Sequence, residues 1–283
     1  RAFTGWTFDQ PPPLYPHGNY PSRFRYDPDD HDDGVKTFLG EIGRLNGEDI
    51  IDIIVRQEAT ACFISRHLYN FFVADEIQVS AWSEVPPQNP EAIELLMRSY
   101  VDSNGDIRSM LRVLFNADWF KRAQYRKVKS PADLITGVIK LVGTFRFPDH
   151  GMDSLANASK AMGQQLMNPP TVEGWHTGKE WISGATLNER VNFAVDQVGD
   201  KTKPGILEIV SALGDSGTSL SPEEFVDRSL DLAGPVEATK ETRVGLVKHA
   251  SLQGTLHIGK ETASSRVSEM LQLIVATPEY QMG

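Results

Sequence analysis

An acidic segment near the start of the chain carries side chains that could do acid–base chemistry. His31, Asp32 and Lys36 place an imidazole, a carboxylate and an amine within six residues of one another. A carboxylate beside an imidazole raises the pKa of the imidazole and fixes its tautomer, so these residues are weak candidates for a catalytic cluster. Adjacent residues seldom point the same way, so the cluster needs a further partner from elsewhere in the chain.

The same segment superficially matches a calcium-binding loop. Asp29, His31, Asp33 and Gly34 stand at the spacing of the first, third, fifth and sixth positions of such a loop. The twelfth position, which should supply a bidentate carboxylate, is Gly40. We therefore expect no metal and no other cofactor, with Asp29 and Asp33 as weak metal candidates only. A turn in which the Asp side chains cap local backbone groups is the favoured interpretation.

A second candidate site lies between Leu166 and Phe193, where a Pro-Pro pair interrupts the helical pattern and two tryptophans follow in a glycine-rich loop. Apolar rings alternate there with polar groups, a mixture typical of a site that stacks and hydrogen-bonds a sugar. The residues concerned are Glu173, Trp175, His176, Lys179 and Trp181. Glu173 is a weak catalytic candidate, and Trp175, His176, Trp181 and Arg190 are candidate ligand-binding residues.

The alternative is that the tryptophans of this loop dock it onto the core. Each ring would then bury about 150 to 250 Å². We favour docking, because Asn188, Arg190 and Asn192 follow at even spacing on the next helix and could hold the loop in place. Arg66 and Arg190 could each bind a carboxylate through a bidentate fork, either from an internal acid or from a ligand.

Other catalytic signatures are missing from the sequence. We find no Ser–His–Asp or Cys–His arrangement, no phosphate-binding loop and no zinc spacing. His67 shares an apolar helix face with Phe63 and Phe71, which predicts a neutral core imidazole. Hydrolytic chemistry therefore lacks an evident nucleophile.

The composition is that of a globular protein, and the charge balance argues against some classes of partner. Of 283 residues, 40% are hydrophobic and 23% are charged. Lys and Arg total 28 against 38 Asp and Glu, a net charge of −10. No basic stripe is available, so we expect neither nucleic acid nor an anionic membrane surface as a partner. The single Cys62 excludes an internal disulfide, and no apolar run is long enough to span a bilayer.

Helical periodicity from Glu48 onward predicts an all-α fold, a multi-helix orthogonal array with an irregular N-terminal segment and a Pro/Gly/Trp-rich loop. We expect residues 1–47 to pack on the body as the irregular segment and residues 48–283 to form a single helical domain. Capping boxes predict helix starts at Ser130 and Ser221, and Gly143 predicts a helix end.

Several motifs resemble a bacterial family, domain of unknown function 1800. They are RAFTGWTF at residues 1–8, HDDGVKTFLG at 31–40, ACFISRHLYNFFV at 61–73, NPPTVEGWHTGKEWISGATLNERVNFA at 168–194 and LIVATPEYQ at 273–281. The resemblance covers the C-terminal part of the family domain, whose members carry a further N-terminal helical region. We therefore expect the chain to be a fragment of a longer protein.

The resemblance implies a largely helical bacterial protein that is exported, so we expect a periplasmic or secreted location. Members are commonly encoded beside the family called domain of unknown function 1501, which is similar to alkaline phosphatases and sulfatases. We expect a binding or assembly partner of that neighbour. The alternative is a polysaccharide-acting hydrolase or lyase, with a glycan as ligand and a site near the tryptophan loop and His31. The resemblance supplies no catalytic residues.

Overall fold

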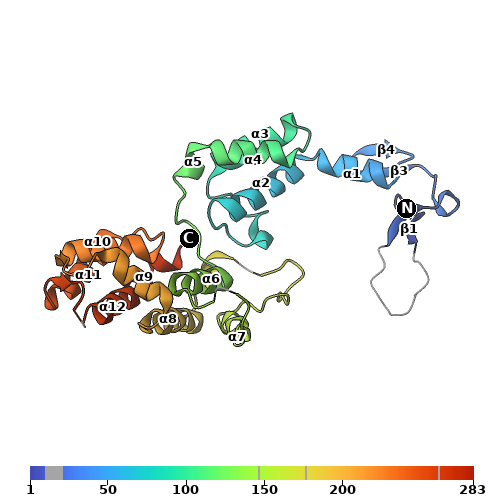
Figure 1. Ribbon diagram of the computed structural model, residues 1–283. Coiled ribbons are helices and arrows are strands. Elements are labelled where there is room, and N and C mark those ends of the chain that lie inside the picture. Colours follow the sequence, from blue (N-terminus) through green and yellow to red (C-terminus); the bar gives the residue numbers. More distant parts are fainter. Residues whose placement is uncertain (10–21, 146, 176, 261) are drawn as a thin grey trace. The chain divides into compact units, whose positions relative to one another are not determined.

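The chain was analysed as a computed structural model that describes residues 1–9, 22–145, 147–175, 177–260 and 262–283 (Figure 1). Two compact units are present. Unit 1 comprises Arg1–Leu68 and Asn89–Ala117, and unit 2 comprises Tyr69–Gln88 and Asp118–Gly283. These bounds do not coincide with the division expected at residue 47, and a single helical domain stays a prediction.

Helices dominate both units. They hold 56% of the described residues, and the strands of this part form only two-stranded antiparallel sheets. The predicted all-α class is confirmed. No helix in the described part is both long and apolar enough to cross a membrane.

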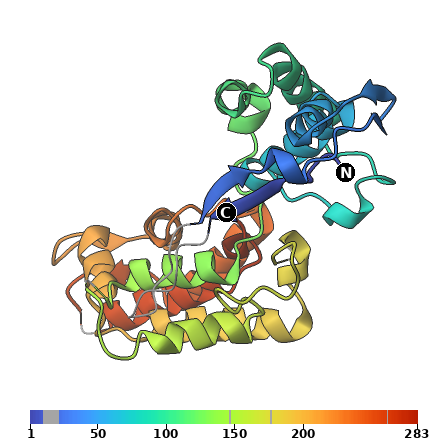
Figure 2. The ribbon, with the colours of Figure 1, turned by 90° about the vertical axis from the view of Figure 1, so that its right-hand side faces the viewer.

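Unit 1 begins with two short strand pairs. The bounds are β1 Trp6–Asp9 paired with β2 Arg23–Tyr26, and β3 Lys36–Phe38 paired with β4 Glu41–Gly43. Figure 2 shows β1 and β2 side by side as a ribbon. Trp6 packs edge-on against Phe24 across this pair, with ring centroids 5.1 Å apart. Such cross-strand aromatic contacts stabilise short antiparallel ribbons. A Cβ on Gly47 would lie 2.4 Å from the Trp6 ring, so the ribbon packs closely against the next helix.

Unit 1 has one short helix between its two strand pairs and further helices after them. They are η1 Pro28–Asp30, α1 Gly47–Val55, the first part of α2 Glu58–Phe72, α3 Pro90–Asp102 and α4 Ile107–Asn116. Asn46 and Asp49 form a capping box at the start of α1. The Tyr100 hydroxyl of α3 donates to the Val55 carbonyl oxygen at 2.9 Å, which ties α3 to the end of α1.

Unit 2 holds the remaining elements. Before the main helices come η2 Val79–Ala81 and α5 Asp118–Lys121. They are followed by α6 Pro131–Val142, α7 Asp153–Ala161, η3 Gly178–Trp181, α8 Gly184–Gly199, α9 Pro204–Leu213, β5 Ser219–Leu220, α10 Pro222–Ala233, α11 Lys240–Leu252, β6 Leu256–His257, α12 Ala263–Val275 and η4 Glu279–Gln281. The capping boxes predicted at Ser130 and Ser221 are both present, and Gly143 ends α6 in the left-handed conformation with φ 65°.

The core of unit 2 forms where α12 packs against α8, α9, α10 and α11, and where α6 packs against α8 and α9 (Figure 1). Buried side chains from these helices fill it, and Val138, Val198, Ile206, Phe225 and Leu271 are among the most deeply buried. Because apolar burial contributes about 25 cal/mol per Å², this core is the main source of stability of unit 2.

Candidate functional site

The acidic N-terminal segment is held by contacts inside unit 1. The Arg1 guanidinium pairs with Asp32, with 2.6 Å between Nε and Oδ2, and the Gly34 amide donates to Oδ1 at 2.8 Å. The hydrogen bonds from Arg1 and Gly34 hold the pKa of the Asp32 carboxyl well below its usual range. The Lys36 ammonium donates to the backbone carbonyl oxygens of Asp32 and Gly34. Asp32 and Lys36 therefore serve to fix the loop.

His31 is also engaged within unit 1. Its Nδ1 atom lies 2.8 Å from the Thr4 carbonyl oxygen, and its ring meets Tyr26 edge-on with centroids 5.6 Å apart. The bond to a carbonyl oxygen places the proton on Nδ1 and leaves Nε2 as the free acceptor. Asp32 is adjacent in sequence, but its carboxylate is paired with Arg1 rather than with His31.

The two weak metal candidates lie in the same loop. The Asp29 amide donates to the Asp27 carboxylate at 3.3 Å, so Asp27 caps the short helix η1. Within the described residues, no group of three or more His, Cys, Asp or Glu side chains is placed to hold a metal ion. The capping turn predicted for this segment is thus present, supplied by Asp27 and Asp32 rather than by Asp29 or Asp33.

The other two sequence candidates of unit 1 lie on α2. Arg66 is buried, and the pKa of His67 is lowered by burial. His67 packs edge-on against Phe63, with ring centroids 4.4 Å apart. The lowered pKa favours the neutral imidazole expected from the sequence. Phe63, placed on the apolar face, is nevertheless exposed.

The tryptophan loop is docked through one of its two rings. Trp181 is buried with 7% of its surface exposed, and its carbonyl oxygen accepts from Thr186 Oγ1 at 2.9 Å. Trp175 is half-buried, and its Nε1 atom is shielded from solvent without a hydrogen-bond partner in the described residues. Glu173 is exposed. His176 lies outside the described residues. The burial of Trp181 favours docking, while Trp175 keeps an unused donor.

A second anchor of this loop lies at Gly178. Its φ of +66° is left-handed, and a Cβ there would lie 2.9 Å from the Asp75 side chain. Gln78 Nε2 donates to the Thr177 carbonyl oxygen at 3.5 Å. The loop therefore rests against the segment that follows α2, a contact that no spacing in the sequence indicates.

Arg190, a candidate ligand-binding residue, is fully buried. Its Nε atom donates to Gln281 Oε1 at 2.8 Å, and Nη2 donates to the Lys129 carbonyl oxygen at 2.8 Å. Burial lowers the pKa of Arg190 to about 10, and nearby Asp133 opposes that shift. These contacts join α8 to two other segments. Arg190 therefore has a structural role, and its buried side chain is not accessible to a ligand.

Lys129, whose carbonyl oxygen accepts from Arg190, also contacts the end of the chain through its own side chain. Its ammonium donates to the Tyr280 carbonyl oxygen at 2.9 Å and lies 4.5 Å from the centre of the Tyr280 ring. Burial and the neighbouring Arg190 lower the pKa of Lys129 to about 8. Residues 127–129 also pair with the end of the chain, because the Lys129 amide donates to the Gln281 carbonyl oxygen at 2.8 Å.

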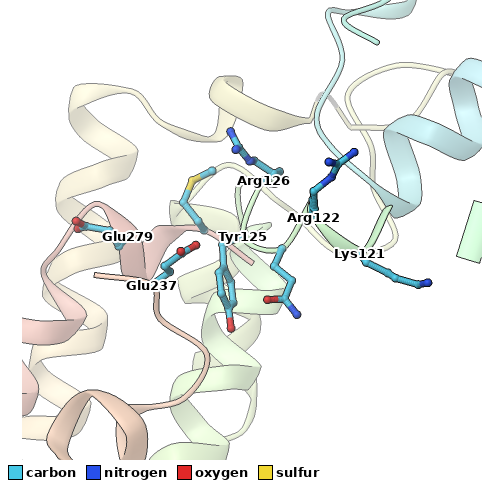
Figure 3. Close-up of a pocket in the computed structure, with 8 residues that line it drawn as sticks. Lys121, Arg122, Tyr125, Arg126, Glu237 and Glu279 are labelled. Atoms are coloured by element: carbon cyan, nitrogen blue, oxygen red, sulfur yellow. The ribbon is translucent and has the colours of Figure 1, made fainter. Parts of the chain in front are cut away.

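An open pocket of about 380 Å³ lies beside this junction (Figure 3). Its walls come from the segment after α5, from the loop before α11, and from the turn after α12. The lining residues are Lys121, Arg122, Gln124, Tyr125, Arg126, Glu237, Glu279 and Met282. Residues of both charge signs therefore line one cavity. Sequence reasoning did not single out any of these residues, and their only local signal is the basic run between Lys121 and Lys129.

Comparison with known proteins identifies the family of the chain, but no individual related protein. A family model described as protein of unknown function (DUF1800) matches residues 1–282. Neither the curated proteins nor the solved structures contain a match to the chain. The match includes both units and every motif on which the resemblance was based. The chain belongs to the DUF1800 family.

Proposed function

We propose that this protein is a binding or assembly factor, whose partner is the phosphatase-like or sulfatase-like product of the neighbouring domain of unknown function 1501 family. The observation that supports the proposal is an apolar segment, residues 147–172 of unit 2. It exposes five large apolar side chains, Phe147, Met152, Leu166, Met167 and Val172. Exposed large apolar side chains are suited to contact the surface of a partner protein.

The backbone of the apolar segment holds one of these side chains outward. Met167 is 95% exposed and has a φ of +62°. A non-glycine residue in this left-handed conformation costs about 1 to 2 kcal/mol. A turn accompanies this conformation, in which the Asn168 amide donates to the Gln165 carbonyl oxygen at 3.1 Å. Flexible methionines are well suited to contact a partner surface.

The polysaccharide-acting enzyme is less well supported by the contacts. His31 bonds to the Thr4 carbonyl oxygen, and Arg190 is buried with its donors directed to Gln281 and Lys129. Among the described candidates of the tryptophan loop, the ring of Trp175 is half-buried and Glu173 is exposed. From the family resemblance we also infer that the protein is exported from a bacterial cell, and fractionation of a native host tests the location.

The partner is tested by copurification of the full-length protein from a native host. We expect the phosphatase-like product to be recovered with the wild type. The double variant Met167→Asp, Val172→Asp should lower that recovery at least tenfold. A matched control is Val244→Asp, which places the same charge at an exposed apolar position of α11 and should leave recovery unchanged.

Two outcomes reject the binding proposal. One is recovery of the wild-type protein alone, and the other is undiminished recovery of the partner with the double variant. Turnover of a glycan that is lost in His31→Ala or Glu173→Gln would support the enzyme instead.

A further inference from the structure

The helix α1 of unit 1 carries two apolar faces, and only one of them is covered. Ile50 and Ile53 are buried, with 6% and 1% of their surface exposed. Ile51, Ile54 and Val55 form a second stripe at helical spacing, and each exposes more than 40% of its surface. A surface helix normally presents polar residues on the side that faces solvent. The second face of α1 is therefore an apolar surface without a partner among the described residues.

The exposed stripe of α1 continues into a cavity. Val55 lines an open pocket of about 430 Å³ together with Tyr100 and Val101 of α3, and Val101 is 67% exposed. The lining is completed by Arg56, Asn104 and Gly105. The hydrogen bond from the Tyr100 hydroxyl to the Val55 carbonyl oxygen fixes the two walls relative to each other. The exposed side chains of Ile51, Ile54, Val55 and Val101 thus form one surface with this pocket, the α1–α3 surface.

One edge of the α1–α3 surface is acidic. Glu48 and Asp52 each stand three residues before a member of the apolar stripe, so both lie beside it on the helix surface, and both are exposed. Neither forms an ion pair within the part of the chain that the structure describes. Arg56, the basic residue of the pocket lining, pairs with Glu41 at 3.3 Å between Nη2 and Oε1. Two carboxylates therefore border the stripe without a cation.

Two helices also end at this pocket. α1 ends at Val55 and α3 ends at Asp102, directly after Val101, and both valines line the cavity. The last carbonyl groups of a helix carry partial negative charge, which a basic side chain in the last turn commonly offsets. Neither α1 nor α3 has a basic residue in its last turn. The pocket therefore favours a cation that another molecule supplies.

We propose that the α1–α3 surface binds a basic amphipathic helix of another protein. The apolar face of that helix packs on the exposed stripe, and its Lys or Arg side chains contact Glu48, Asp52 and the helix ends at the pocket. Amphipathic helices are recognised by apolar side chains at such spacing, and complementary charge at the rim excludes wrong partners. An acidic helix would be repelled by the two carboxylates. This surface belongs to unit 1 and is separate from the apolar segment of unit 2 proposed above as a docking site.

Isothermal titration calorimetry of the purified chain with synthetic peptides tests this proposal. The probe is a leucine–lysine peptide of about 14 residues, four helical turns, with the leucines on one face. One matched peptide replaces every lysine by glutamate and so reverses the charge. A second replaces every leucine by alanine, which keeps the helix and removes most of the apolar face. We expect the leucine–lysine peptide to bind and the other two to bind at least tenfold more weakly.

Variants place the peptide on the α1–α3 surface. The double variant Ile51→Ser, Val101→Ser removes exposed apolar area and should lower the affinity for the leucine–lysine peptide at least tenfold. The double variant Glu48→Gln, Asp52→Asn removes the acidic edge. It should lower the affinity at least threefold and make it less dependent on salt, because fewer charge contacts remain to be screened.

Matched controls lie in unit 2. Glu241→Gln, Val244→Ser makes the same kinds of change at exposed positions of α11 and should bind as the wild type does. Met167→Ser, Val172→Ser should also bind normally, so this test is independent of the partner proposed for the apolar segment.

Four outcomes overturn the proposal. They are absence of binding by the leucine–lysine peptide at millimolar concentration, equal binding of the glutamate peptide, wild-type affinity in either double variant of unit 1, and loss of binding in Met167→Ser, Val172→Ser. If the variant Ile51→Ser, Val101→Ser does not fold, the exposed Val101→Ser alone gives the measurement.

Discussion

The guanidinium group of Arg190 donates to the backbone carbonyl oxygen of Lys129 at 2.8 Å across 61 residues of sequence. The same side chain donates to Gln281 at 2.8 Å, so α8, the segment before α6 and the turn after α12 meet at one buried cation. Its Nη1 atom has no hydrogen-bond partner in the described part of the chain. Lys129 of this junction follows closely after residues 121–126, which line the charged pocket.

Arg190→Met should destabilise the protein by about 3 kcal/mol, because two hydrogen bonds from a charged group are worth about 1.5 kcal/mol or more each. The measurement is the free energy of unfolding in urea. Lys140→Met, at an exposed position of α6, is the control and should change stability by less than about 0.5 kcal/mol. A neutral effect of Arg190→Met would show that the buried charge costs as much as its contacts contribute.

The buried phenol of Tyr280 should make the protein less stable at alkaline pH. Burial raises the pKa of its phenol from 10.0 to about 12. The unfolded chain therefore loses this proton first, and stability falls as the pH rises from 10 toward 12. By pH 11 the loss from this residue is about 1 kcal/mol. The free energy of unfolding, measured from pH 9 to 11, should fall less steeply with pH in Tyr280→Phe than in the wild type. Parallel curves for the two proteins would contradict this.

Trp181→Ala should destabilise the protein by about 3 to 5 kcal/mol, since it removes a large buried ring and leaves a cavity. Trp175→Ala should cost less, because that ring is half-buried. Thermal unfolding of both variants checks the order. A larger loss for Trp175→Ala would mean that the second ring, rather than the first, anchors the loop.

Gly178→Ala and Gly174→Ala form a matched pair. Both glycines have left-handed φ values, +66° and +102°, but only Gly178 has a neighbour, Asp75, where a Cβ would stand. Each variant should therefore lose about 1 kcal/mol from backbone strain, and Gly178→Ala should lose more because of the contact. Equal losses in chemical denaturation would show that the loop moves aside from Asp75.

The sequence by itself determined the features that depend on neighbouring residues. The helix starts at Ser130 and Ser221 were predictable because a capping box is complete within four residues, and the left-handed end at Gly143 needs only a glycine. The family was likewise evident from short motifs in a fixed order, and the match over residues 1–282 confirms it.

Only the tertiary structure decided which polar groups meet. His31 and Asp32 were weak candidates for one catalytic cluster with a partner from elsewhere in the chain, and their partners are Thr4 and Arg1, more than 25 residues away. The charged pocket draws its walls from Arg122, Glu237 and Glu279, which have no common spacing. Helix periodicity specifies the face that a residue occupies on its own helix. The contacts between helices are set by how the apolar faces pack together, and that packing places Arg190 in the interior and the charges of the pocket around one cavity.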